Sequence, residues 1–415
     1  MFIVNKRFVI FFVATQPIIT ACLLRYTSKL SSLRAFNLLA ILMLVYIGCT
    51  TRQEINGLAI SYQLLGGAAA TIFLHSVQLL YILKADVTDL THIQRLRKHP
   101  VSQFGIALLL ASDPRAIGTR WEPKNLPALA PCFRSSDSPR PLFLLRNTVI
   151  FLWKYLVLDV IVTLFGSEKS HGYRYYQHDL HFILNPFSTD WITRVAASLL
   201  MWPIMLRLTL DIQYTAISLI LVGTGVCETG NWPPFFGSIS DAYTIRKFWN
   251  TYWHQLLRWP LTSCSRFITR TVLRLPSPSW IERYLNILCA FFLSGLIHIF
   301  ATSTVGMPKD EAGSIKFFSL FTVAIIIEDT VQAMYRRFTT NGSSQSKALW
   351  KRAVGYLWVL CCFSVNTPGF TYDLIHSYAN TPSLLPFSFT KHLGEKVVIV
   401  LLLAGAATLK RVKVM

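Results

Sequence analysis

Nine long apolar runs restrict what this chain can fold into more than any other feature. Runs long enough to cross, or nearly cross, a bilayer lie at 8–24, 36–49, 58–83, 147–165, 190–226, 285–302, 316–333, 353–365 and 395–409. The backbone must satisfy its hydrogen bonds internally within lipid, so we expect a helix at each run. The run at 190–226 is too long for one simple span. The expected fold is therefore an all-α polytopic membrane protein with about nine to eleven transmembrane helices.

Composition agrees with this expectation. Charged residues make up 14% of the 415 residues, whereas soluble domains carry about 25%. No stretch of 100 residues lacks a long apolar run, so we expect one integral membrane domain over 1–415. The eight cysteines are scattered, with no C-x-x-C pair and no cysteine–histidine cluster at metal spacing. We expect neither a disulfide scaffold nor a bound metal.

The net charge of +20 lies mainly between the apolar runs. A negatively charged membrane face or an anionic substrate explains this placement better than nucleic acid does. Lys and Arg gather in 25–34, 95–140, 246–283 and 336–352 and in the C-terminal tail. The positive-inside rule places these segments in the cytosol. Within 190–226, Arg207 and Asp211 are four residues apart and could neutralise each other on one helix face.

The most informative stretch runs from Asn231 to Ala301 and begins NWPPFFGSISDAYTIRKFWNTYWHQLLRWP. In a helix near 241–259, Arg246, Asn250 and His254 would recur at i, i+4 and i+8 and share one face. Trp249 and Trp253 would line an adjacent stripe. A basic, aromatic helix of this kind, stopped by Pro260, is typical of the membrane interface. The alternative is an amphipathic anchor without any chemistry.

The second part of this stretch places His298 inside an 18-residue apolar run. An ionisable residue is costly in a membrane, which favours a functional role. Apolar surroundings favour the neutral imidazole, which can accept a proton. Small or short residues surround it one turn away on either side: Ser294, Gly295, Ala301 and Thr302. They leave space for another helix or a substrate. The alternative is a packing histidine bonded to a neighbouring carbonyl.

The block at 231–312 resembles the wax-synthase-type domain of fungal acyltransferases, which is related to membrane-bound O-acyltransferases. The resemblance is carried by WPPFFGSISDAYTIRKFWNTYWHQ, in which several aromatic residues and the histidine fall in order, and by the apolar helix around His298. It covers about a fifth of the chain. Similar proteins in fungal terpenoid and meroterpenoid pathways O-acetylate a hydroxyl with acetyl-CoA. The sequence departs from wax synthases in having Ile299, and not an acidic residue, after the histidine.

The resemblance implies catalytic roles for His298 and for the pair Asn250 and His254. Neutral His298 would accept the proton of a hydroxyl that attacks a thioester, and Asn250 or His254 would bond the oxyanion or position the alcohol. Arg246 and Lys247, with Arg258 as a further candidate, could bind the CoA phosphates or anchor to lipid headgroups. We count Trp249 and Trp253 as substrate-binding residues.

The implied partners are acetyl-CoA as co-substrate, a small hydrophobic alcohol and the lipid bilayer. We expect no bound cofactor, and a multi-pass protein of the endoplasmic reticulum membrane.

Two alternatives remain open. A long-chain wax ester synthase would use the same residues with a larger acyl pocket. A secondary transporter would use intramembrane polar groups, which here are His75, Lys154, Asp159, Glu328 and Asp329. The chain contains no G-x-S-x-G, Walker A or H-x-x-x-x-D motif, so the serine hydrolase, NTPase and soluble acyltransferase classes lack their residues.

Overall fold

The fold is known from a computed structural model, and every regular element of the residues described is a helix. The structure describes residues 6–50, 59–86, 88–90, 102–133, 139–166, 188–189, 191–192, 196, 199–304, 313–338, 346–378 and 385–414. Its longer helices are α1 (Lys6–Tyr26), α2 (Ser32–Thr50), α3 (Ala59–Val77), α5 (Gln103–Ser112), α6 (Arg140–Gly166), α8 (Arg207–Gly223), α10 (Arg258–Arg266), α11 (Trp280–Ser303), α12 (Ser314–Phe338), α13 (Ser346–Tyr378) and α15 (Glu395–Val414).

Shorter elements connect these helices. The π-helices are η1 (Gln78–Ile82), η4 (Leu200–Leu206), η7 (Phe248–Tyr252) and η8 (Phe267–Val272). Single turns are η2 (Pro131–Phe133), η5 (Thr229–Asn231), η6 (Ile239–Asp241), α9 (Ile245–Lys247) and α14 (Phe389–Leu393).

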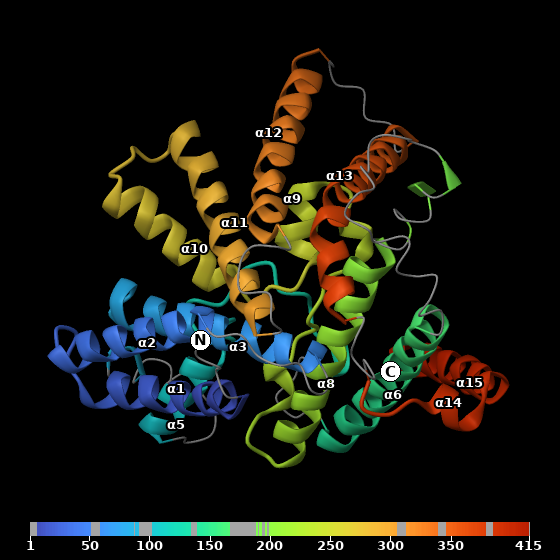
Figure 1. Cartoon of the computed structure of the whole chain (residues 1–415), viewed down its shortest axis with the longest axis horizontal. Coiled ribbons are helices and arrows are strands. Elements are labelled where there is room, and N and C mark those ends of the chain that lie inside the picture. The colour runs from blue at the N-terminus through green and yellow to red at the C-terminus, as the bar shows by residue number, and fades with distance from the viewer. Residues whose placement is uncertain are drawn as a thin grey trace.

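Helix α11 is the central element of the arrangement. It packs against α12, α3 and α10, while α1, α2, α3 and α5 gather on one side (Figure 1). On the opposite side, α6 packs against α8, α14 and α15. Two glycines, which have no side chain, explain the close approach of α11 to its neighbours. A Cβ on Gly295 would lie 3.0 Å from the Cα of Ile315, and a Cβ on Gly66 would lie 3.1 Å from the Cα of Ala301. Small residues at these crossings let backbones meet, as in other membrane helix pairs.

Six helices in the described ranges are long and apolar enough to cross a membrane. They are Val9–Tyr26, Gln63–Ile82, Pro203–Gly223, Trp280–Ser303, Ser314–Phe338 and Leu349–Thr371. The runs at 36–49, 147–165 and 395–409 are also helical, in α2, α6 and α15. They are not among the six, so the expected count of nine to eleven is not confirmed.

The expected ion pair between Arg207 and Asp211 is wrong. Asp211 instead binds Lys154 of α6, with 2.5 Å between Nζ and Oδ2. Arg207 donates to the hydroxyl of Tyr252 at 2.9 Å. Each side chain therefore bonds a residue of another segment, in α6 and in η7, and not its neighbour four residues away.

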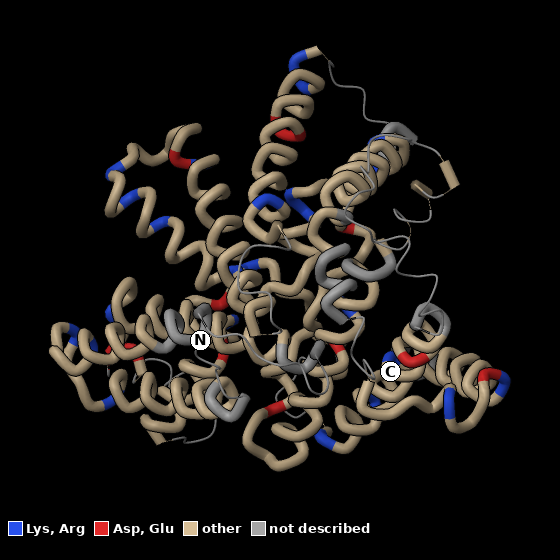
Figure 2. The backbone as a smooth tube through the Cα atoms, viewed as in Figure 1, with Lys and Arg blue, Asp and Glu red and all other residues tan. Residues whose placement is uncertain are grey.

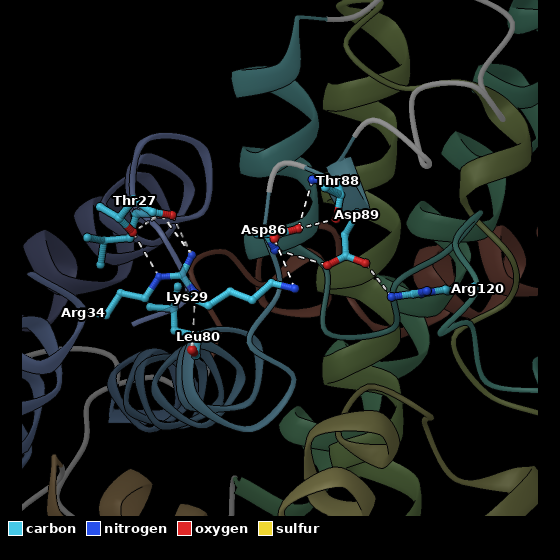
Figure 3. Close-up of polar contacts among 9 residues, drawn as sticks. Thr27, Lys29, Arg34, Leu80, Asp86, Thr88, Asp89 and Arg120 are labelled. Carbon is cyan, nitrogen blue, oxygen red and sulfur yellow. Dashed lines mark hydrogen bonds and ion pairs between the residues drawn. The ribbon is translucent and has the colours of Figure 1, made fainter. Parts of the chain in front are cut away.

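Lys, Arg, Asp and Glu are sparse along the helices, and long stretches of the backbone carry none of them (Figure 2). One buried exception is Arg34 of α2, which donates to the carbonyls of Leu23, Thr27 and Leu80 (Figure 3). It satisfies acceptors at the C-terminal end of α1 and ties α1, α2 and η1 together. Beside it, Lys29 pairs with Asp86, and Arg120 pairs with Asp89 (Figure 3).

Candidate active site

A cavity of about 630 Å³ lies between α3, α8, α10, α11 and the segment 232–255, which we call the aromatic motif. Its wall includes six of the seven site residues expected from the sequence: Arg246, Trp249, Asn250, Trp253, His254 and His298. Lys247 does not line it. Residues up to 52 positions apart in the sequence therefore line one cavity, since His298 comes from α11 and the others from the segment before α10.

His298 faces this cavity from the buried side of α11. Its ring stacks on Phe318 of α12, with centroids 4.6 Å apart, and meets Phe370 of α13 edge-on at 5.9 Å. Ser294 and Ala301 line the cavity next to it, while Leu296 of the same helix is exposed. Aromatic rings rather than a carboxylate thus orient the imidazole within the described part of the chain. This agrees with the absence of an acidic residue at position 299.

The expected continuous interfacial helix over 241–259 is not formed. The chain makes the single turn α9 and the π-helix η7, becomes extended at Trp253, and begins α10 at Arg258. Pro260 lies in the first turn of α10, where its missing N–H is tolerated, and is therefore not a helix stop. Ile245, Phe248, Tyr252 and Trp253 are buried in an aromatic core with α12 and α13. This segment is a core element and not a surface anchor.

Hydrogen bonds from other parts of the chain explain why the helix ends at Tyr252. The backbone N–H of Gly237 donates to the Tyr252 carbonyl at 2.8 Å. The Gln255 amide donates to the carbonyls of Trp249 and Trp253, and Arg258 donates to the Asn250 carbonyl at 3.0 Å. Carbonyls that a longer helix would have satisfied are satisfied by these groups instead. The break turns His254 out of the helix and toward the cavity.

His254 lies among aromatic rings beside the cavity. Its ring stacks on Phe235, with centroids 5.4 Å apart and planes at 17°, and meets Phe236 edge-on. Its Nδ1 is buried and makes no hydrogen bond with the residues described. Burial, the neighbouring His298 ring and the charge of Arg115 together lower the pKa of His254 to about 3. The imidazole is therefore neutral throughout the physiological pH range.

The two basic residues expected at a phosphate site have protein partners. Arg246 binds Asp329 of α12, which also accepts from Arg283 and Tyr284. Lys247 donates to the hydroxyl of Tyr243 and lies over its ring, with Nζ 4.1 Å from the centroid. Arg246 remains at the cavity wall and one-third of its side chain is exposed. Arg258 also lines the cavity.

The intramembrane polar groups have structural partners rather than a common pathway. His75 bonds Gln78 and the Leu110 carbonyl through its two ring nitrogens. Asp159 accepts from Thr390 at the start of α14, and Glu328 accepts from the Ile245 N–H at 2.7 Å. Among the residues described there is no group of three or more His, Cys, Asp and Glu side chains that could hold a metal ion.

Sequence reasoning missed several cavity residues. Helices α3 and α8 contribute Gln63, Thr71, Thr209, Gln213 and Tyr214, and none of these carries a recognisable motif. It also missed Arg115, which lies behind Phe235. The Asp-Pro-Arg turn at 113–115 was a possible signal, but nothing in the sequence shows which surface that turn contacts.

Known proteins with a similar sequence include a membrane enzyme family and several fungal acetyltransferases. The model of the membrane bound O-acyl transferase family matches residues 232–320. The chain is 31% identical to acetyltransferase atnC of Arthrinium sp. over 92% of its own length and 91% of that protein. It is 33% identical to acetyltransferase TRI7 of Fusarium sporotrichioides, over 82% and 80% of the two chains. It is also 33% identical to acetyltransferase pyr8 of Aspergillus fumigatus, over 84% and 81%.

The chain therefore belongs to the membrane-bound O-acyltransferase family and is a membrane-bound acyl-transferring enzyme. No solved structure matches it. The matched segment overlaps the motif region at 231–312, while the single domain over 1–415 stays a prediction.

Proposed function

We propose that this protein transfers acetyl from acetyl-CoA to a hydroxyl of a hydrophobic, terpenoid-class alcohol, in the endoplasmic reticulum membrane. One observation carries the proposal: His298 of α11 lines the same cavity as Asn250 and His254 of the aromatic motif. The three relatives described above are acetyltransferases, which supports acetyl as the transferred group.

The proposed mechanism is direct transfer. The neutral imidazole of His298 accepts the proton of the alcohol as its oxygen attacks the thioester carbonyl carbon. Asn250 or His254 donates to the negative oxygen of the tetrahedral intermediate. The intermediate then expels the CoA thiolate, which takes the proton from the imidazolium, and the products are the acetyl ester and CoA. No acyl-enzyme forms, and every proton is accounted for.

The cavity suits a mainly apolar acceptor. Most of its wall is apolar, with a few polar groups such as Gln63 and Gln213. The apolar lining includes Leu206, Leu210, Ile217, Phe291 and Ile297. An apolar wall with few polar groups binds a hydrophobic body and orients one functional group. Trp249 and Trp253 contribute to the same wall and are proposed to contact substrate.

Arg246, at the cavity wall, is the favoured residue for pairing with the CoA phosphates, because Arg can form bidentate bonds with a phosphate. Lys247 is oriented toward Tyr243 and has a weaker case. Arg258 lines the cavity as well and is the second candidate.

The test is incubation of membranes containing the protein with labelled acetyl-CoA and a set of hydroxylated terpenoids. Label should appear in an ester product, and membranes with His298→Ala at equal abundance should form at least about 10²-fold less of it. A parallel incubation with a labelled long-chain acyl-CoA and a long-chain alcohol tests the wax ester alternative. Ester formation only in that second incubation would overturn the acetyl assignment while leaving the acyltransferase class intact.

A further inference from the structure

The loop that follows α5 is built to present one arginine inward. The Asp113 carboxylate accepts from the backbone N–H groups of Arg115 and Ile117, at 3.0 and 2.9 Å. Glu122 accepts from the N–H of Gly118 at 2.7 Å. Further along, Trp121 stacks on Trp259 of α10, with centroids 5.4 Å apart. These bonds hold the loop in one conformation against the body of the protein.

Arg115 is buried, with 3% of its surface exposed, and carries a charge without a paired carboxylate in the described ranges. Asp113, the acidic residue of the same turn, uses both oxygens on backbone N–H groups. The Nη1 of Arg115 is buried and has no hydrogen-bond partner among the residues described. A buried cation in this condition is destabilising, so packing alone is a poor explanation for it.

Arg115 is connected to the aromatic motif by two routes. Its Nη2 donates to the Tyr214 hydroxyl at 2.6 Å, and that hydroxyl donates to the Pro233 carbonyl at 2.7 Å. Its guanidinium carbon also lies 5.6 Å from the centre of the Phe235 ring. Phe235 stacks on Tyr214 and on His254, with centroid separations of 4.7 and 5.4 Å. The guanidinium therefore holds the ring against which the His254 imidazole is stacked.

We propose that Arg115 is a positioning residue of the active site, which fixes His254 through Tyr214 and Phe235 and places a positive charge behind it. The proposal deepens the proposed function, on which it rests. In acyl transfer, negative charge develops on the carbonyl oxygen, and a fixed cation near the donor group favours that charge. A misplacement of the donor by about 1 Å can cost about 10²-fold in rate.

The experiment compares Arg115→Gln and Arg115→Lys with Arg120→Gln as the matched control. Arg120 lies in the same loop but pairs with Asp89 on the surface, and 56% of its side chain is exposed (Figure 3). Purified proteins are compared for kcat, for KM of acetyl-CoA and for thermal stability. We expect Arg115→Gln to lower kcat about 10²-fold with KM little changed, Arg115→Lys to restore part of that loss, and Arg120→Gln to match the wild type.

A second readout needs no turnover. Diethyl pyrocarbonate modifies neutral accessible imidazoles, and mass spectrometry measures the modification at His254 and His298 separately. Loss of Arg115 should loosen Phe235 and raise the modification rate of His254 relative to His298, whereas Arg120→Gln should leave the ratio unchanged.

Two results would overturn the positioning role. One is wild-type kcat per folded molecule in Arg115→Gln, and the other is an unchanged His254 to His298 modification ratio. If the wild type itself transfers acetyl to no acceptor, the proposed function fails, and the modification ratio still decides whether Arg115 positions His254.

Discussion

At the scale of single residues, the surroundings of His298 bear on its two interpretations, a catalytic base and a packing residue. A packing histidine would have its ring nitrogens bonded within the protein, as His75 does with Gln78 and Leu110. The His298 ring instead stacks on Phe318, meets Phe370 edge-on and lines the cavity. This setting supports the proposed role of a general base.

We predict that His298→Gln lowers product formation by about 10² to 10⁴ while the protein accumulates in membranes near the wild-type level. Removal of a positioned base takes away transition-state stabilisation and leaves substrate binding nearly intact. The measurement is labelled ester per unit of protein, with acetyl-CoA binding measured separately. His392→Gln, the same change at an exposed position, is the control. Retention of more than about a tenth of the wild-type rate would end the assignment.

Kinetic measurements on variants also show whether Asn250 or His254 donates to the oxyanion. We expect His254→Ala and Asn250→Ala to lower kcat less than His298→Gln, except that the residue that donates to the oxyanion should lose about 10² to 10³. Steady-state kcat and KM for each variant identify which one it is. If neither variant loses as much as tenfold, the oxyanion is bonded by another group of the cavity wall.

At the scale of elements, the break after η7 decides where the histidine of the aromatic motif lies. Gly237 is required for this break, because a Cβ there would lie 2.2 Å from the Thr251 carbonyl oxygen. The close approach allows the Gly237 N–H to bond the Tyr252 carbonyl. The aromatic loop and the end of the helix are therefore one packed unit.

We predict that Gly237→Ala destabilises the protein by about 1–3 kcal/mol, as overpacking typically does, and lowers activity with it. Gly230→Ala is the matched control, since a Cβ at Gly230 would have no heavy atom within 4 Å. Thermal unfolding in detergent checks the difference. Equal midpoints for the two variants would show that the loop can move away from η7 at little cost.

At the scale of the whole molecule, the placement of Lys and Arg predicts orientation. We expect the 246–283 segment and the C-terminal tail to face the cytosol together. If α11, α12 and α13 each cross the membrane once, the tail reaches that side only if α15 crosses as well. Helix α15 is not among the six helices that are long and apolar enough to cross. Protease protection of a tag after Met415 tests this directly. A lumenal tag beside a cytosolic 246–283 segment would show that α15 does not cross.

The sequence alone determined the class of fold and the candidate residues, because both depend on local properties. Apolar runs dictate helices in lipid whatever the tertiary arrangement, and the aromatic motif with His298 carries the family resemblance in its residue order. The predicted helix over 241–259 and the Arg207–Asp211 pair were wrong for a common reason. Each assumed that a residue interacts with its helical neighbours.

Tertiary contacts decided these cases instead. The bonds from Gly237, Gln255 and Arg258 end the helix. Asp211 forms an ion pair with Lys154, and Arg246 forms one with Asp329. Only the packed structure brings Arg115 behind Phe235 and both histidines to one cavity, because these groups meet through packing between distant segments that no local pattern in the sequence records.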